Sequence, residues 1–309
     1  MKDMREHPTL LCVATEKGYA VLRAVNEKFP DIQLHVCTFK EVKVAKSYYE
    51  DICAYANKHN IPLHSWKEIH EQGTIWLSEK NIFSMVCVGW RYLIPLEMIE
   101  HLEGRLLVTH DSLLPRYRGF APLASAFING EKEVGVTVML VASEELDTGD
   151  IVYQGKVEID LKDTIGTLTK KILPLFSEGI VSSLKKMFSG NLVGFSQDHS
   201  KATFSIWRDE EDLWINWNDS AKQINRIIRA LGSPYMGART HFGEKTVIIQ
   251  QAIEMPDIQF EIRQPGKVWS LTSAGEPLVI SGKGMLLLCK ATIDDTPMIP
   301  MKNLRVRFK

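Results

Sequence analysis

The first half of the chain alternates short apolar runs of strand length with longer amphipathic stretches of helical period. This alternation restricts the fold most, because strands joined by helices form a mostly parallel sheet with helices on both faces. It begins with an expected strand over 9–14, a helix over 18–29 that Pro30 ends, and a strand over 32–39. Ligands of such sheets bind beyond the carboxyl ends of the strands, so we expect the site there.

The alternation continues to the middle of the chain. A helix is expected over 45–59, followed by strands over 61–63, 82–88, 105–109 and 135–140. A long helical pattern then starts at Thr164, and Pro174 inside it predicts a kink. The polar stretch 197–200 after this helix has the composition of a linker.

The pattern changes after the linker. One helical stretch over 220–231 is followed by short apolar runs at 246–249, 268–271, 278–280 and 285–288. Short strands separated by turns such as Ser281–Gly284 are typical of a small barrel or sandwich. We therefore expect an α/β domain over residues 1–199 and a smaller β-rich domain over 200–309.

Composition narrows the class of protein. With 309 residues and 45% hydrophobic side chains, the chain can bury the cores of two domains. A formal charge of −1 gives no general attraction to nucleic acid or to an anionic membrane, and the polar N-terminal residues predict neither a signal peptide nor a membrane span. Five cysteines without a CxxC pair, all in apolar stretches, predict reduced, buried thiols in a cytoplasmic protein.

The densest polar cluster begins at His110, where the strand over 105–109 delivers a histidine into the loop HDSLLPRYRG. Asp147 stands in a second turn, LDTGD, before the next strand. A histidine and a carboxylate on neighbouring loops of an α/β sheet can act as general acid and base. The residues alone leave a structural hydrogen-bonding role for His110 equally open. No histidine and cysteine spacing indicates zinc, so no metal is expected.

The string HDSLLPRYRGFAP over 110–122, with GVTVM at 135–139 and LDTGD at 146–150, closely resembles the formyltransferase family. This family includes methionyl-tRNA formyltransferase and the N-formyltransferases of nucleotide-linked amino sugars. The resemblance covers nearly the whole chain. It implies the formyltransferase fold, a Rossmann-like catalytic domain followed by a smaller OB-like barrel domain.

The resemblance also implies a reaction, transfer of a formyl group from 10-formyltetrahydrofolate to an amine. His110 is expected to stabilise the oxyanion and to move a proton, while Asp147 orients the imidazole and supports its role as a base. The segment 88–95 resembles the folate-binding segment of the family. The residues implied in cofactor binding are Gly89, Trp90, Tyr92, Leu93, Ile94, Ser112, Leu114 and Asp147.

One position departs from the family pattern, which places an asparagine two residues before the histidine. Here that residue is Val108. Residues 108 and 110 share a strand face, so Val108 is expected to point where the carboxamide belongs, and valine donates no hydrogen bond. Loss of one oxyanion donor typically costs about 10²- to 10³-fold in turnover.

The expected acceptor is the amine of a UDP- or dTDP-linked amino sugar, which implies a role in lipopolysaccharide O-antigen biosynthesis. From Lys201 to Lys309 there are 15 Lys plus Arg and 12 Asp plus Glu, and a net charge of +3 is weak for a tRNA-binding surface. Aromatic rings can stack on a base or sugar, and arginines can bind a diphosphate. The candidate substrate-binding residues are Arg116, Tyr117, Gly119, Trp207 and Tyr235.

Two other functions stay open. A methionyl-tRNA formyltransferase has the same motifs, and a folate- or nucleotide-sugar-binding homologue with weakened turnover would explain Val108. The sugar-acting relatives make a homodimer compatible with the sequence. No nucleic-acid partner and no membrane partner are expected under the leading hypothesis.

Overall fold

The computed structural model describes residues 7–41, 46–235 and 237–309, and these residues form two compact units. Along the chain, the first unit comprises residues up to Leu123, Glu133–Glu158 and Thr169–Ile206. The second comprises Ala124–Lys132, Ile159–Leu168 and Trp207–Lys309. The predicted domain boundary at 199/200 stays a proposal, although residues 200–206 belong to the first unit.

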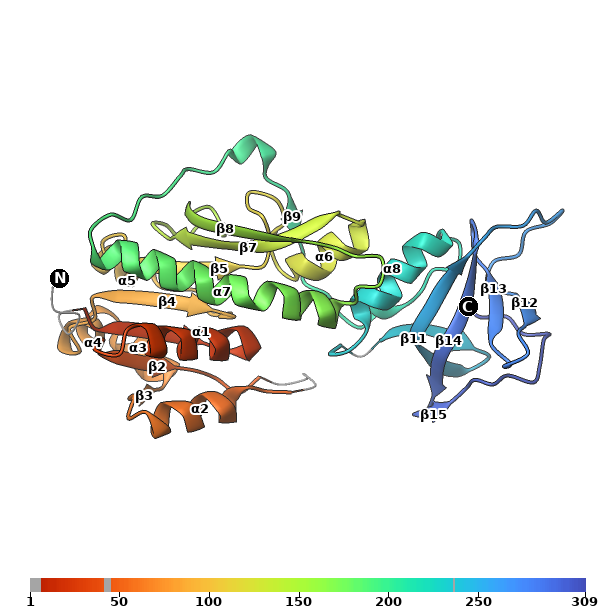
Figure 1. Cartoon of the computed structure of the whole chain (residues 1–309), viewed down its shortest axis with the longest axis horizontal. Helices are drawn as coiled ribbons and strands as arrows, with labels where there is room; N and C mark the ends of the chain where they lie inside the picture. The colour runs from red at the N-terminus through yellow and green to blue at the C-terminus, as the bar shows by residue number, and fades with distance from the viewer. Residues whose placement is uncertain (1–6, 42–45, 236) are drawn as a thin grey trace. The chain divides into compact units, whose positions relative to one another are not determined.

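The first unit contains a mixed sheet with the strand order β3-β2-β1-β4-β5-β7-β8. Its strands are β1 (Thr9–Val13), β2 (Leu34–Cys37), β3 (Leu63–His64), β4 (Ser84–Val88), β5 (Leu106–His110), β7 (Glu133–Leu140) and β8 (Asp150–Glu158). The strands β1 to β5 pair in parallel, whereas β7 runs antiparallel to both β5 and β8. This confirms the predicted mostly parallel sheet (Figure 1).

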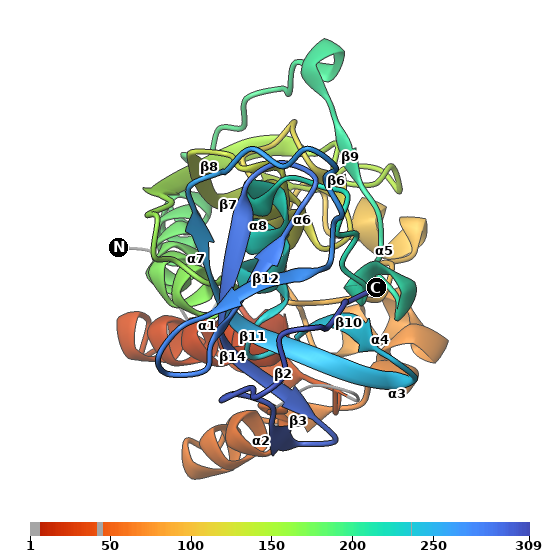
Figure 2. The ribbon, with the colours of Figure 1, turned by 90° about the vertical axis from the view of Figure 1, so that its right-hand side faces the viewer.

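Helices cover both faces of this sheet. The helices of the first unit are α1 (Thr15–Lys28), α2 (Tyr49–Lys58), α3 (Trp66–Gln72), α4 (Thr74–Glu79), α5 (Leu96–His101) and most of α7 (Ile165–Phe188), whereas most of α6 (Pro122–Asn129) belongs to the second unit. The helices α1 and α7 lie on one side of the strands, and α3, α4 and α5 lie on the other (Figure 2). On the second side, Trp76, Leu77 and Met98 pack against Leu10 and Met85 of the central strands. This packing buries the strands on both faces, which explains their continuous apolar sequences.

The element boundaries differ from the predicted ones in informative ways. The short helices α3, α4 and α5 were not predicted, because six or seven residues give too little helical periodicity. The strand β5 continues through His110, which had been placed in the loop. The helix expected from residue 45 begins at Tyr49, and Ala45 lies outside the described residues. Pro174 lies inside the single helix α7.

The stretch expected as a linker is partly integrated into the first unit. Gln197 is buried, and a turn of 3-10 helix, η2 (His199–Lys201), follows it. The strand β9 (Phe204–Ser205) then pairs in parallel with β6 (Arg118–Gly119), directly after the His110 loop. No sequence pattern predicts this pairing, because two-residue strands have no periodicity.

The second unit is built on an antiparallel sheet with the order β10-β11-β14-β13-β12. Its elements are η3 (Glu211–Leu213), α8 (Ala221–Leu231), β10 (Ala238–Phe242), β11 (Lys245–Met255), β12 (Val268–Leu271), β13 (Pro277–Ile280), β14 (Met285–Ile293) and β15 (Thr296–Pro297). Residues at the chain end bridge both outer strands, since Phe308 pairs with Phe242 and Arg307 pairs with Lys267 next to β12. These bridges close the sheet toward a barrel, as predicted.

A single hydrophobic core holds the second unit together. Ile224 and Ile228 of α8 pack with Trp217, Leu286 and Phe308. The helix starts at Ser220, whose hydroxyl accepts a hydrogen bond from the Gln223 N–H at 3.2 Å. None of the helices within the described ranges is long and apolar enough to cross a bilayer.

All five cysteines are free thiols. Three of them, Cys12, Cys37 and Cys87, are buried in the sheet of the first unit, whereas Cys53 and Cys289 are only partly buried. The prediction of buried thiols is therefore correct for three and too strong for two, which lie nearer the surface. Burial raises the pKa of the Cys12 thiol well above its ordinary value, as expected for core filler.

Candidate active site at the carboxyl edge of the sheet

His110 is the last residue of β5 and is 7% exposed. Its Nε2 lies 2.8 Å from the carbonyl oxygen of Tyr117, and because a carbonyl only accepts, this hydrogen bond requires a proton on Nε2. Its Nδ1 lies 3.6 Å from Oδ2 of Asp147. The loop after β5 thus folds back and holds the imidazole against the carboxylate.

Asp147 lies in the turn before β8, and its backbone has a φ of 55°, in the left-handed region. Its Oδ2 accepts a hydrogen bond of 2.8 Å from the backbone N–H of Gly119. The side chains of His110 and Asp147 have exposed fractions of 8% and 10%. The structure therefore brings together, in a largely dry corner, the two residues that the sequence singled out.

The loop between His110 and Gly119 is held by its own hydrogen bonds. The Ser112 hydroxyl donates to the carbonyl of Arg116 at 2.7 Å, and the Thr137 hydroxyl donates to the carbonyl of Ser112 at 2.7 Å. The backbone of Leu114 donates to Thr137 at 3.2 Å and accepts from the Gln154 side chain at 2.8 Å. Ser112 and Leu114, both predicted to bind cofactor, are buried in this loop.

The predicted substrate residues of the loop have different environments. Arg116 is exposed, and its guanidinium lies 5.2 Å from the centre of the Tyr117 ring. Tyr117 is buried and has a φ of 61°. Gly119 has a φ of 100°, and a Cβ at this position would lie 2.4 Å from the carbonyl oxygen of Ser205. Only glycine fits there, which lets β6 and β9 approach and aims the Gly119 N–H at Asp147.

The segment 89–95 follows β4 at the same edge of the sheet. Gly89 has a φ of 61°, and a Cβ on it would lie 2.7 Å from the carbonyl oxygen of Ala14. Trp90 and Tyr92 are partly covered in an aromatic cluster with Phe39 and Trp66, with ring centroids 5.3–6.1 Å apart. These two side chains therefore shape the loop, whereas Leu93 beyond them is 76% exposed.

The backbone of residues 90–94 differs from the His110 loop in its hydrogen bonding. Within the described ranges of the chain, these residues form no backbone–backbone hydrogen bond, and Nε1 of Trp90 is buried without a protein partner. A flat heteroaromatic ring with N–H and C=O groups on its edge is the kind of ligand that pairs with such a loop. Ile94, which is 9% exposed, adds an apolar wall.

A charged cluster that the sequence did not predict lies at the start of α1. The ammonium of Lys17 forms an ion pair with the carboxylate of Asp111, the residue after His110. Glu41 lies near Lys17 and Arg91, and burial raises the pKa of its carboxyl group while these two cations oppose the rise. The first turn of α1 and the loops after β2, β4 and β5 thus each supply a charged group at this edge.

Val108 makes apolar contacts, as its side chain predicts. It packs against the cluster that contains Leu106, Ile94 and Met98. Thr109, on the other face of β5, donates to the carbonyl of Cys87 at 3.4 Å. Neither side chain takes the place of the family asparagine.

Trp207 and Tyr235, the remaining substrate candidates, belong to the second unit. They are 62% and 54% exposed. The related segment 234–238 includes Met236, which lies outside the described residues. Their role in binding stays a prediction.

Two residues that hold the site together were not predicted as functional. Arg118 is 4% exposed and donates to Oε1 of Gln197, at 2.7 Å from Nη2 and 3.3 Å from Nε. The sequence signal for Arg118 was its place inside the HDSLLPRYRG string. Gln197 had no signal, because it stands in a polar stretch far along the chain.

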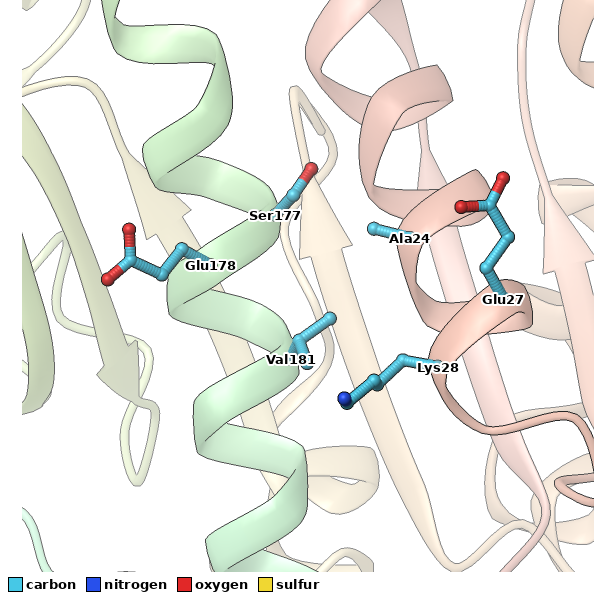
Figure 3. A pocket seen from close by; sticks show the side chains of 6 residues that line it. All are labelled: Ala24, Glu27, Lys28, Ser177, Glu178 and Val181. Atoms are coloured by element: carbon cyan, nitrogen blue, oxygen red, sulfur yellow. The ribbon is translucent and has the colours of Figure 1, made fainter.

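A hollow of about 330 Å³ lies elsewhere, between α1 and α7. Its walls are formed by Ala24, Glu27, Lys28, Ser177, Glu178 and Val181 (Figure 3). None of the predicted site residues lines it, so it is separate from the His110 corner. Among the residues with a described position, no group of three or more His, Cys, Asp or Glu side chains could hold a metal ion.

Two family models match most of the chain. The model of the formyl transferase family matches residues 25–184, and that of the formyl transferase C-terminal domain matches residues 208–307. The chain belongs to the formyl transferase family. A methionyl-tRNA formyltransferase of Carboxydothermus hydrogenoformans is 37% identical over 205 residues, 66% of this chain and 65% of that protein. The chain thus matches slightly less than two thirds of that relative.

Solved structures of formyl transferases have a similar fold. WlaRD, a sugar 3N-formyl transferase determined in the presence of dTDP and 5-N-formyl-THF, has a TM-score of 0.66 and 17% identity, covering 94% of this chain and 98% of its own. An N-formyltransferase of Helicobacter canadensis, in complex with folinic acid and dTDP-3-aminofucose, has a TM-score of 0.65 and 16% identity, with coverages of 91% and 98%. At these identities the likeness concerns the fold.

Proposed function

We propose that this family member transfers a formyl group from 10-formyltetrahydrofolate to the amine of a nucleotide-linked amino sugar. The observation that carries the proposal is the buried pair of His110 and Asp147, 3.6 Å apart at the carboxyl edge of the sheet. The loop 90–94 lies at the same edge and, among the described residues, forms no backbone–backbone hydrogen bond, which suits recognition of the edge of a pterin ring. Gly89, Leu93 and Ile94 are the residues we assign to that contact.

The folate supplies the formyl carbon, and the side chains of this protein handle charge and protons. His110 accepts, at Nδ1, the proton that the acceptor amine releases as the new amide bond forms, because Nε2 already carries a proton that it donates to Tyr117, and it returns a proton to the departing nitrogen. Asp147 supports the positive charge on the imidazole and fixes its orientation. The Gly119 N–H holds the carboxylate, so little reorganisation is needed at the moment of reaction.

Two features support a sugar acceptor. The residues from Lys201 to Lys309 carry a net charge of only +3, which is weak for binding many phosphates of a tRNA. Trp207 and Tyr235 are aromatic residues of the second unit that are 62% and 54% exposed, and aromatic rings are the side chains that stack on a base or sugar. Arg116 and Tyr117 are our further candidates for the acceptor.

A second candidate, formylation of methionyl-tRNA, is favoured by the relatives that match in sequence. The decisive experiment incubates the protein with 10-formyltetrahydrofolate and either UDP- and dTDP-linked amino sugars or charged initiator tRNA. We expect product with one amino sugar and a loss of about 10³-fold in His110→Ala. Product with tRNA alone would refute the sugar assignment. Folate binding without product in every case would indicate a homologue with weakened turnover.

A further inference from the structure

Gln197 stands in the polar stretch that the sequence predicted to be a linker, yet it is 5% exposed. Its carboxamide lies between two parts of the site that are far apart in sequence. One part is Arg118, in the short strand after the His110 loop, and the other is the turn that carries Asp147.

All polar atoms of this carboxamide are used. Nε2 donates to the carbonyls of Asp147 and Gly149, both at 2.8 Å. Oε1 accepts from the guanidinium of Arg118, at 2.7 Å and 3.3 Å. The neighbours fix its orientation, because the guanidinium only donates and the two carbonyls only accept. A charged donor on Oε1 also polarises the amide and strengthens the bonds that Nε2 makes.

The Asp147 turn needs such external support. Its backbone φ of 55° lies in the left-handed region, which Asp adopts more readily than most residues but still at a cost, so contacts from the surrounding structure help to hold it. Two Gln197 bonds hold the backbone of this turn, and the Gly119 bond holds the carboxylate. The backbone of the turn sets where the carboxylate lies relative to Nδ1 of His110.

We infer that Gln197, backed by Arg118, is a positioning residue that sets the place of the Asp147 carboxylate beside His110. It acts through Asp147 and has no contact with the reacting atoms. The inference rests on the proposed function only where it predicts a change in kcat. Its structural part, the position of the Asp147 turn, is tested without enzymatic activity.

Two variants separate the possible roles of Gln197. Gln197→Met keeps the volume and removes every polar contact. Gln197→Glu keeps an acceptor for Arg118, now as an ion pair, but removes the donors to the Asp147 turn. The matched control is Thr9→Val at the opposite edge of the sheet, which removes two buried bonds, to the His7 carbonyl at 3.0 Å and the Ser84 hydroxyl at 2.9 Å.

We expect kcat to fall about 10²-fold in both Gln197 variants, the effect of a misplaced group of about 1 Å. The KM for the folate is expected to change less than kcat, and Thr9→Val is expected to lower the melting temperature without changing kcat. On an Asp147→Asn background, Gln197→Met is expected to cost less than about 3-fold, because residues acting through one group are not additive.

Full kcat in Gln197→Glu, or full additivity with Asp147→Asn, would overturn the inference while leaving the proposed function intact. Crystal structures of wild type and Gln197→Met test it without turnover. We expect the distance from His110 Nδ1 to Asp147 Oδ2 to lengthen beyond 3.6 Å in the variant. An unchanged Asp147 turn would refute the positioning role even in a protein without activity toward any acceptor tested.

Discussion

Two neighbouring regions of the sheet edge are built in opposite ways. In the corner of His110 and Asp147, the two side chains are 8% and 10% exposed and have protein hydrogen-bond partners. In the loop 90–94, the backbone groups form no backbone–backbone bond within the described chain, and Leu93 is mostly exposed.

This contrast separates chemistry from binding. Groups that move protons work best when they are held in place before the substrate arrives. A loop that recognises a ligand through its backbone has to leave those donors and acceptors unused until the ligand binds. A substitution in the corner of His110 and Asp147 is therefore expected to change mainly kcat, and a substitution in the loop 90–94 to change mainly the affinity for the folate.

Asp147→Asn gives the strongest test of the corner of His110 and Asp147. The amide oxygen can still accept the Gly119 N–H, so the fold is expected to survive, but the negative charge beside His110 is lost. We expect kcat to fall about 10²- to 10³-fold, with a smaller change in folate affinity because Asp147 is also among the residues implied in cofactor binding. Steady-state kinetics and calorimetric titration check both, and near-full activity would refute the role of the carboxylate.

Gly89→Ala tests the open loop. The added methyl meets the Ala14 carbonyl at 2.7 Å at a φ of 61°, so the loop has to shift. We expect a loss of about 2 kcal/mol in stability and about 10-fold in folate affinity, with a smaller effect on kcat. Gly243→Ala is the matched control, because its φ is 62° and no atom lies within 4 Å of the new methyl. Equal losses in the two variants would show that the close approach is unimportant.

Val108→Asn restores the family asparagine next to the rigid corner. If the missing donor limits turnover, we expect kcat to rise about 10-fold, part of what one oxyanion donor contributes. A polar amide against the apolar cluster around Ile94 is expected to lower stability by about 1 kcal/mol. Val108→Ala, which adds no donor, serves as the control. A variant no faster than wild type would mean that another group already supplies the hydrogen bond.

A pH titration tests whether tight polar packing is confined to the site. His35 on β2 is buried, and its Nδ1 lies 2.9 Å from Nε2 of His64. Burial, with smaller contributions from His64 and Lys80, lowers the pKa of His35 to about 4. The unfolded chain therefore binds more protons between pH 6.5 and 4, so stability is complete above about pH 6.5 and falls as the pH drops.

We expect the free energy of unfolding to fall by about 2 kcal/mol between pH 7 and pH 5, measured by denaturant titration. His35→Gln is expected to remove most of this slope, whereas the exposed His101→Gln keeps it. An unchanged slope in His35→Gln would assign the pH dependence to other groups.

Much of the fold was predictable because long elements have clear periodicity. The strand pattern near 9–14 and the helix pattern from Thr164 became β1 and α7 within one or two residues. The helices α3, α4 and α5 and the pairing of β6 with β9 were missed, since short elements are stabilised by tertiary packing alone. The site residues His110 and Asp147 were found through the motifs around them, whereas Gln197 was assigned to a linker.

By itself, the sequence determined the alternation of strands and helices, the parallel sheet, the edge where ligands bind, and the side chains able to do acid–base chemistry there. Only the tertiary structure decided how those side chains are held. Hydrogen bonds such as those from Gln197 to the Asp147 turn join residues 50 positions apart. Their geometry depends on the folding of whole elements, and local periodicity contains no information about it.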